Sequence, residues 1–140
     1  MNKATFDEVT HEFLAAFMEK FLGAWEMRSG EEVAKLCTED VVWIDPSVPT
    51  VLNGRDDVAQ FVDSLFLGFP DARFEPEGGP AISRDGQTAF APFRMTGTNS
   101  GPFESLGIAA TGKAIAVRGV DTYRFRGGLI ARYQIGRAHV

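Results

Sequence analysis

The sequence has little cysteine and little histidine, and this limits the chemistry that it can carry. Its 140 residues include one cysteine, Cys37, and two histidines, His11 and His139. A single cysteine excludes an internal disulfide and fits a reducing compartment. Neither histidine has a second ligand at metal spacing, so we predict no metal site. The glycine-rich stretches EGGP and RGGL match no phosphate-binding loop, and we expect no cofactor.

The chain also lacks a long apolar run and a concentration of basic residues. No segment has the uninterrupted apolar length of a membrane span, and the first ten residues, MNKATFDEVT, have no signal pattern. The net charge is −5 and the 14 Lys and Arg residues are scattered, which argues against a nucleic-acid surface. We therefore expect a cytoplasmic protein that binds neither nucleic acid nor a membrane.

Phenylalanine is abundant, with 12 copies against two tyrosines and two tryptophans. Hydrophobic residues make up 44% of the chain and charged residues 24%, as in a soluble globular protein. A chain of this length fits one domain with one core, so we predict a single domain over residues 1–140. Phenylalanine adds bulk without a polar group, which suits either a wide core or an apolar cavity.

Hydrophobic periodicity predicts helices in the first half of the chain. A helical stripe over residues 6–25 follows the capping-box pair Thr5 and Glu8. A second capping box, SGEE, precedes a short helix that carries residues 33–37. A third helical stripe of apolar residues, over residues 58–69, predicts a third helix that ends at Pro70.

The other segments predict strands. They are VVWID, a short strand at Phe74, and strands over residues 88–98, 114–126 and 129–135. Asp-Gly in RDGQ and Gly-Gly in RGGL are turn signals between successive strands. Helices followed by antiparallel strands predict an α+β domain with helices on one face of a sheet, and glycine or proline inside the long strands favours curvature.

A carboxylate lies on the apolar face of the strand that contains VRGVDTYRF. Period-two alternation places Asp121 on the same face as Val117, Tyr123 and Phe125, with the arginines on the other face. Such a carboxylate is paired, protonated or at the sheet rim. The structural alternative to a catalytic role is a rim position or a salt bridge to an arginine such as Arg94.

A second carboxylate, Asp45, ends VVWID directly before Pro46. Asp-Pro often closes a strand and starts a turn, which is the simpler interpretation of Asp45 alone. Asp45 nevertheless shares strand parity with Trp43, so both carboxylates point into one cavity if both strands curl around it. The pocket that we expect is mostly apolar and is lined by Phe17, Phe21, Trp25, Trp43, Phe61 and Tyr123.

Two segments and the order of the elements resemble the nuclear transport factor 2-like superfamily. LCTEDVVWIDPSVPTVLNGRDDVAQF is similar to the region of bacterial Δ5-3-ketosteroid isomerases that carries the catalytic base before a proline. AIAVRGVDTYRFRGGLIARY is similar to their late strand, which carries a carboxylic acid. Both segments also resemble small polyketide cyclases. The resemblance implies a cone-shaped fold with three N-terminal helices packed on a curved, mostly antiparallel sheet.

By position, the resemblance implies a division of roles between the two carboxylates. Asp45 matches the proton-shuttling base, and Asp121 matches the protonated acid that donates a hydrogen bond to the substrate oxygen, as in ketosteroid isomerase. Two positions depart from these families. Phe21 replaces the tyrosine of the isomerase oxyanion hole, and Ile135 lies near the position of the cyclase acid/base.

The resemblance implies a small cofactor-independent enzyme that acts on a lipophilic carbonyl compound, such as a steroid or polyketide. The reaction would be an isomerisation or an aldol-type cyclisation, and we expect a homodimer formed through the sheet. The alternatives are an epoxide hydrolase of the same fold and a non-catalytic module that binds a small hydrophobic ligand. A catalytic Asp121 should have a raised pKa, whereas a salt-bridged Asp121 should have a lowered pKa.

Overall fold

The computed structural model describes residues 5–138, and these form three α-helices, one short 3-10 helix and seven strands. The helices are α1 (His11–Glu26), α2 (Gly30–Ala34), α3 (Gly54–Gly68) and η1 (Glu104–Leu106). The strands are β1 (Cys37–Ile44), β2 (Leu52–Asn53), β3 (Arg73–Pro76), β4 (Ala81–Ile82), β5 (Ala89–Thr98), β6 (Ala114–Arg126) and β7 (Leu129–Ala138). The α-helices lie in the first half of the chain, but β1 and β2 come between α2 and α3.

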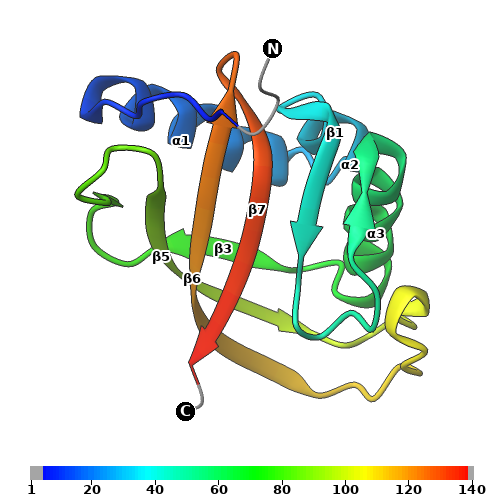
Figure 1. Cartoon of the computed structure of the whole chain (residues 1–140). Coiled ribbons are helices and arrows are strands. Elements are labelled where there is room, and N and C mark those ends of the chain that lie inside the picture. The colour runs from blue at the N-terminus through cyan, green and yellow to red at the C-terminus, as the bar shows by residue number, and fades with distance from the viewer. Residues whose placement is uncertain (1–4, 139–140) are drawn as a thin grey trace.

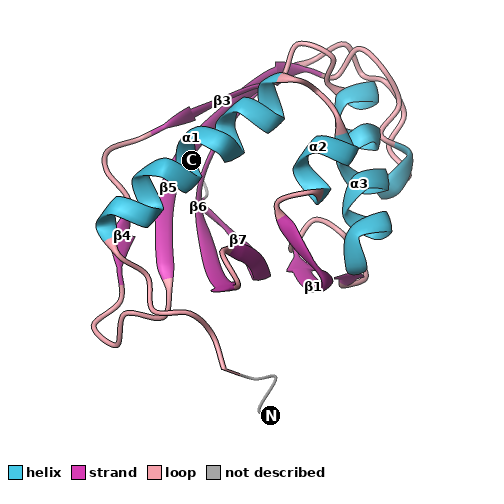
Figure 2. Ribbon diagram, turned by 90° about the horizontal axis from the view of Figure 1, so that it is seen from above, coloured by secondary structure: helices cyan, strands magenta, loops and turns pink. Residues whose placement is uncertain are grey.

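The strands form one curved sheet in the order β2-β1-β7-β6-β5-β3, and β4 pairs with β5. All pairs are antiparallel except β1 with β7, which are parallel. The helices lie on one face of this sheet (Figures 1 and 2). The predicted α+β class and the mostly antiparallel sheet are confirmed. No helix within residues 5–138 has both the length and the apolar content needed to cross a membrane.

The predicted start of the first helix is wrong. Thr10, not Thr5, is the N-cap, and its side chain accepts a hydrogen bond from the Phe13 N–H at 3.1 Å. The residues before Thr10 are not helical, because their backbone donors bind the ends of two hairpins. The Asp7 N–H donates to the Phe125 carbonyl and the Val9 N–H to the Gly86 carbonyl, each at 2.7 Å.

The second helix begins where its capping box predicts and ends sooner. The Ser29 side chain accepts from the Glu32 N–H at 3.3 Å, and Val33 is fully buried. Cys37 belongs to β1 and not to this helix, and it is completely buried. Burial raises the pKa of the Cys37 thiol to about 12, so this cysteine is a small core residue.

The two glycine-containing turns form hairpins as predicted. Ile82 pairs with Ala89 across the Asp85-Gly86 turn, and Arg126 pairs with Leu129 across Gly127-Gly128. Both glycines of the second turn have positive φ, 62° and 78°, as a two-residue hairpin turn requires. The register of β6 and β7 then shifts between Arg124 and Phe125, which marks a bulge in β7.

Candidate active site

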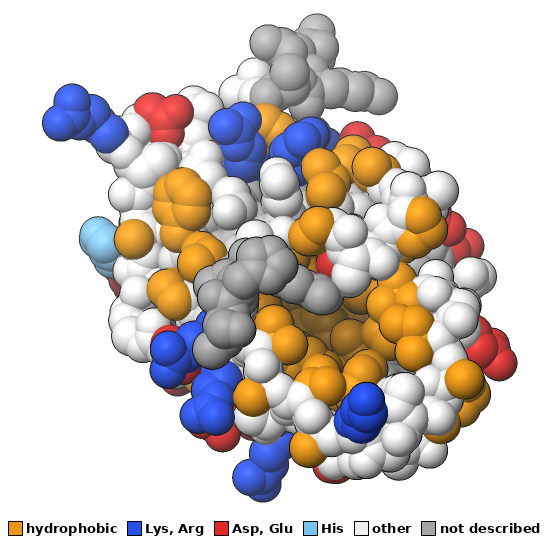
Figure 3. Space-filling view, turned by 90° about the horizontal axis from the view of Figure 1, so that it is seen from below, with side chains coloured by type: hydrophobic (Ala, Val, Ile, Leu, Met, Phe, Trp, Pro, Cys, Tyr) orange, Lys and Arg blue, Asp and Glu red, His pale blue; other side chains and the backbone are white. Residues whose placement is uncertain are grey.

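An apolar cavity of about 480 Å³ lies between the helices and the concave face of the sheet. It opens on one side of the molecule, where hydrophobic side chains surround the hollow (Figure 3). The burial of residues along the inner face of β6 shows which end of the cavity is open. Ile115 and Val117 are half-buried, whereas Asp121, Tyr123 and Phe125 are buried. The cavity is therefore open near the start of β6 and closed towards its end.

Most of the predicted pocket residues line this cavity. They are Phe21, Trp25, Phe61, Tyr123, Asp45 and Asp121. Phe17 and Trp43 do not form its wall but lie in the core behind it. The Phe17 ring contacts Phe125 at 4.8 Å, and the Trp43 ring stacks on Tyr133 at 3.8 Å, between ring centroids. Periodicity correctly predicts that Phe17 and Trp43 point towards the protein interior. It does not show whether an inward side chain lines the cavity or lies in the core behind it.

Asp121 lies deep in the cavity and is held by two phenols. The residue is 8% exposed. Its Oδ2 accepts a hydrogen bond from the Tyr123 hydroxyl at 2.9 Å, and its Oδ1 accepts one from the Tyr133 hydroxyl at 2.6 Å. Arg94 is exposed, and the suggested salt bridge to Asp121 is not formed.

Burial dominates the acidity of Asp121. It raises the pKa of the carboxyl to about 7, although the hydrogen bonds from Tyr133 and Tyr123 favour the ionised form, and the charge of Asp45 adds to the rise. The pKa values of both tyrosines are raised well above 10, chiefly by burial and then by the Asp121 charge. The phenols therefore remain donors, while Asp121 populates both protonation states near neutral pH.

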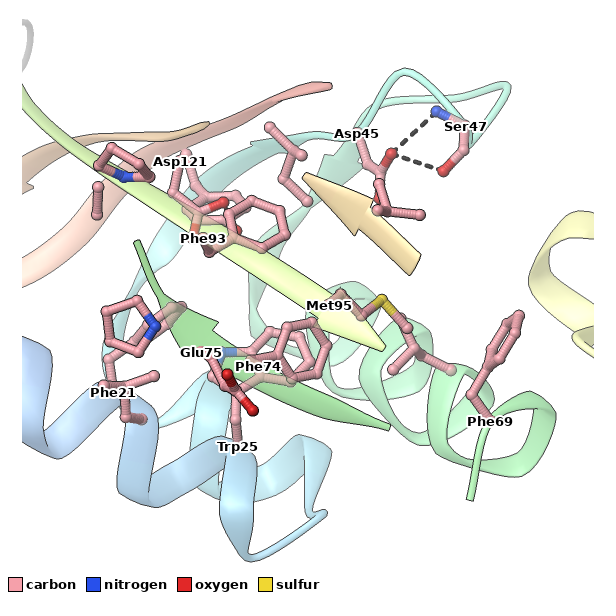
Figure 4. Close-up of a pocket in the computed structure, with 18 of the residues that line it drawn as sticks. Phe21, Trp25, Asp45, Ser47, Phe69, Phe74, Glu75, Phe93, Met95 and Asp121 are labelled. Carbon is pink, nitrogen blue, oxygen red and sulfur yellow. Dashed lines mark hydrogen bonds between the residues drawn. The ribbon is translucent and has the colours of Figure 1, made fainter. Parts of the chain in front are cut away.

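Asp45 lies just after β1 and lines the same cavity (Figure 4). It is 4% exposed, and its Oδ1 accepts hydrogen bonds from the Ser47 N–H at 2.9 Å and the Ser47 hydroxyl at 2.6 Å. Its carbonyl accepts from the Val48 N–H at 2.9 Å. Asp45 thus starts the turn that Asp-Pro indicates and also presents a carboxylate to the cavity.

Tyr133, like Ser47 and Phe93, lies in the site but is not among the residues that the sequence pattern predicts there. Continued without a bulge, the hairpin would pair Tyr133 with Thr122 on the outer face of β6, but the bulge in β7 pairs it with Tyr123 instead. The alternation of apolar and polar residues in ARYQI is the signal that could have indicated its inward face. Ile135 pairs with Asp121 and lines the cavity, where it supplies only apolar surface.

The site thus combines an acid, two fixed hydroxyl donors and a second carboxylate. The Phe21 ring packs 5.6 Å from Tyr123 and 6.2 Å from Tyr133, between ring centroids, so this residue of α1 is adjacent to the two tyrosines supplied by the sheet. Within residues 5–138, no three His, Cys, Asp or Glu side chains come together as a metal site would require. His11 is exposed at the start of α1, and His139 lies outside the described residues.

Solved structures of low sequence identity share this fold. One is a SnoaL-like polyketide cyclase by name, from Jannaschia sp. CCS1, with a TM-score of 0.76, 20% identity, and coverage of 95% of this chain and 90% of that one. Another, from Catenulispora acidiphila DSM 44928, has a ketosteroid isomerase-like fold and was solved with trimethylamine. Its TM-score is 0.68 at 16% identity, with coverage of 91% and 85%.

A third is SalBIII, an epoxide hydrolase/cyclase-like enzyme with a role in pyran ring formation in the polyether salinomycin. Its TM-score is 0.71 at 17% identity. The alignment covers 91% of each chain. At such identities these similarities establish the fold and not the reaction. No curated protein matches the chain significantly. Residues 18–133, most of the sequence, match the profile of the SnoaL-like domain, so the chain belongs to the SnoaL-like domain family within the nuclear transport factor 2-like superfamily.

Proposed function

We propose that this protein is a small cofactor-independent enzyme that transfers protons on a lipophilic carbonyl compound, such as a steroid- or polyketide-like molecule. The observation that carries the proposal is the buried Asp121 carboxyl, fixed by two phenols in an apolar cavity. A carboxyl group whose pKa is about 7 is half protonated near neutral pH, where it can donate a hydrogen bond to a substrate oxygen.

The two carboxylates have complementary roles in this proposal. Asp45 removes a proton from the carbon next to the substrate carbonyl, and the electron pair of that C–H bond moves onto the carbonyl oxygen as an enolate. Protonated Asp121 donates a hydrogen bond to this oxygen and stabilises its charge. Asp45 then returns the proton to a different carbon in an isomerisation. In an aldol cyclisation the enolate carbon instead attacks a second carbonyl, whose oxygen becomes an alkoxide and takes the proton from Asp45.

The cavity and the similar proteins support this class of substrate. Phe21, Trp25 and Phe61 offer apolar surface, and a volume of about 480 Å³ suits a small organic ligand. The names of the similar structures include a polyketide cyclase, a ketosteroid isomerase-like fold and an epoxide hydrolase/cyclase-like enzyme. Non-catalytic ligand binding is the rival function, and the absence of a hydroxyl at Phe21 favours it.

The test combines turnover with binding. The purified protein is given a β,γ-unsaturated ketosteroid, an aromatic poly-β-ketone and an apolar epoxide, and binding is followed by tryptophan fluorescence. We expect turnover of a carbonyl substrate, with a loss of about a hundred- to a thousandfold in both Asp121→Asn and Asp45→Asn. Asp56→Asn, at an exposed position on α3, is the matched control and should retain the activity.

Three results would contradict the proposal. Tight binding of the ketones without turnover would favour the binding module. Turnover of the epoxide alone would favour the epoxide hydrolase. Activity that survives both Asp→Asn substitutions would show that the reaction does not use this pair of carboxylates.

A further inference from the structure

Gly119 is an unusual residue in the middle of β6. The strand is otherwise rich in β-branched, aromatic and basic residues, and glycine weakens a strand unless another group needs its space. Gly119 is buried and lies on the inner face between Val117 and Asp121. Its φ is not positive, so backbone conformation does not explain the glycine. The reason has to be the space that a side chain would occupy.

The ring of Phe93 occupies that space. Phe93 is the cross-strand partner of Gly119 on β5. A Cβ atom on Gly119 would lie 2.7 Å from both Cε1 and Cζ of Phe93, and 2.7 Å from the carbonyl oxygen of Gly136. The far edge of the ring therefore rests on the bare backbone of β6. An aromatic side chain placed over a cross-strand glycine is a known way of covering such a gap in a sheet.

The Phe93 ring on Gly119 lies between the cavity mouth and Asp121. On the inner face of β6, Val117 lies on the half-buried side of Gly119 and Asp121 on the buried side. Asp121 is diagonal to Phe93 across the β5–β6 ladder, within reach of an aromatic ring. Phe93 also lines the cavity and is itself half-buried, and its ring is drawn next to Asp121 in Figure 4.

We propose that Phe93 is a positioning residue whose ring, seated on Gly119, shields the Asp121 carboxyl from water that enters at the cavity mouth. The cross-strand neighbours of Asp121, Ala91 and Ile135, have short or purely apolar side chains, and neither is placed on the mouth side. Among the β5 residues opposite or diagonal to Asp121, Phe93 thus has the largest apolar side chain. The inference deepens the proposed function, since it assigns the residue that maintains the acid in its dry surroundings.

Besides Asp121, the charged and titratable groups among the lining residues that the structure describes come from the sheet and its connections. They are Asp45 after β1, Glu75 on β3, Tyr123 on β6 and Tyr133 on β7. Among the described lining residues, α1 and α3 contribute none. The phenols favour the ionised form of Asp121, whereas burial, the largest effect, and the charge of Asp45 favour the protonated form. Removing the shield should therefore lower the Asp121 pKa, because water stabilises the carboxylate.

The test is a direct titration of Asp121 in the whole protein by carbon NMR of its carboxyl carbon, with Asp121→Asn used to assign the signal. We expect Phe93→Ala to lower the Asp121 pKa by about one unit. Phe93→Leu, which retains an apolar cover, should recover most of the change. Gly119→Ala should lower the pKa as well, because its methyl group would displace the ring from β6, although it would also press on the Gly136 carbonyl oxygen of β7.

Phe69→Ala is the matched control. Phe69 lines the same cavity but follows α3, well away from Asp121 in Figure 4. It should leave the Asp121 pKa unchanged. An unaltered titration in folded Phe93→Ala, or an equal shift in Phe69→Ala, would overturn the inference.

The titration needs no turnover, so the inference can fail or succeed independently of the proposed function. If the protein is active on a carbonyl substrate, the basic limb of its pH–rate profile should move to lower pH in Phe93→Ala by the same amount. If it is inactive on every substrate, the proposed function fails and the titration still decides whether Phe93 shields Asp121.

Discussion

At the scale of single residues, Asp121 and its two phenols form a network in which the carboxyl raises the pKa of each phenol and each phenol lowers the pKa of the carboxyl. Neither tyrosine lies on α1, where the resemblance to ketosteroid isomerases aligns Phe21 with their tyrosine. Both hydroxyls instead come from adjacent sheet strands, and both point at the carboxyl. A network of this kind holds a protonated acid in one orientation, which is what donation to a substrate oxygen requires.

The Tyr133 hydroxyl should lower the Asp121 pKa in the native protein, because it donates the shorter of the two hydrogen bonds to the ionised form. Tyr133→Phe removes this donor with little change in shape. We expect the Asp121 pKa to rise above 7, by about one unit, as measured by carboxyl NMR. The shift is opposite in sign to that of Phe93→Ala. A fall in the pKa would show that solvent entry outweighs the lost hydrogen bond.

Asp121 should also make stability depend on pH. Its pKa is about 7 in the folded state and about 4 in the unfolded state, so the folded state binds more protons between these values. Its contribution to stability is complete below about pH 4 and is lost as the pH rises towards 7, by up to about 4 kcal/mol. Asp121→Asn removes this dependence and should be as stable as the native protein, or more stable, at pH 7.

Urea denaturation of both proteins at pH 5 and pH 8 measures this difference. Titrating groups that do not interact with Asp121 are common to the two proteins and cancel in the comparison, and burial holds the pKa values of Tyr123 and Tyr133 well above this pH range. The free energy of unfolding of the native protein should fall relative to that of Asp121→Asn between the two pH values. Parallel behaviour would mean that Asp121 titrates normally in the folded state.

Phe21→Tyr introduces a hydroxyl at the position that the resemblance aligns with the tyrosine of the isomerases. The ring already packs against Tyr123 and Tyr133 on the cavity wall, so the added oxygen would join the existing donors. Turnover of a β,γ-unsaturated ketosteroid should rise by up to about a hundredfold, measured from the absorbance of the conjugated product. Asp45→Asn in the same background should abolish the gain. An unchanged rate in a folded variant that binds steroid would show that the isomerase template does not apply.

At the scale of the elements, two helical glycines have opposite roles. Gly30 opens α2 where that helix meets α3: a Cβ there would overlap the Ala59 carbonyl, and the Gly30 N–H donates to the Asp63 carboxylate at 2.7 Å. Gly23 lies within α1, and a Cβ would meet nothing within 4 Å. The first glycine permits helix–helix contact, whereas the second has no such use.

Alanine at the two positions should therefore change stability in opposite directions. Gly30→Ala should destabilise the protein by about 1–3 kcal/mol through overpacking. Gly23→Ala should stabilise it by up to about 1 kcal/mol through helix propensity. Chemical denaturation of the pair measures both. A destabilising Gly23→Ala, or a neutral Gly30→Ala, would contradict this account of the α2–α3 contact.

At the scale of the whole molecule, the segment before α1 connects the two hairpins at the closed end of the fold. Asp7 binds the second hairpin twice: its N–H donates to Phe125, and its carboxylate accepts from the Gly128 N–H at 3.0 Å. The Val9 N–H binds Gly86 in the first hairpin. The start of the described chain thus stabilises elements that come far later in the sequence.

Asp7→Ala should test this connection. It removes one acceptor from a half-buried backbone donor, and we expect a loss of about 1–2 kcal/mol in the free energy of unfolding. Glu39→Ala is the control, because the Glu39 side chain is 90% exposed and its ion pair with Arg55 spans 4.0 Å, so little should change. Equal stability of the two variants would show that the segment is only loosely held.

The homodimer expected through the sheet stays a prediction that sedimentation velocity would test.

The sequence by itself determined the features that depend on neighbouring residues. Alternation placed Asp121 on the inner face of β6, the Ser29 box started α2, and the turns Asp85-Gly86 and Gly127-Gly128 marked the hairpins. These features follow from backbone geometry over a few residues. The resemblance of two segments added the family, which the match over residues 18–133 establishes.

Only the tertiary structure decided which of these residues meet. The β7 bulge brings Tyr133 to Asp121, and the layering of the core separates Phe17 and Trp43 from the cavity. The hairpin ends that bind the segment before α1 determine that this helix starts after Thr10. Depth, register shifts and contacts between distant segments set the surroundings of a side chain. The pKa of Asp121 depends on those surroundings. The sequence pattern indicates that this carboxyl lies on an apolar face, but only the fold shows that its pKa is raised.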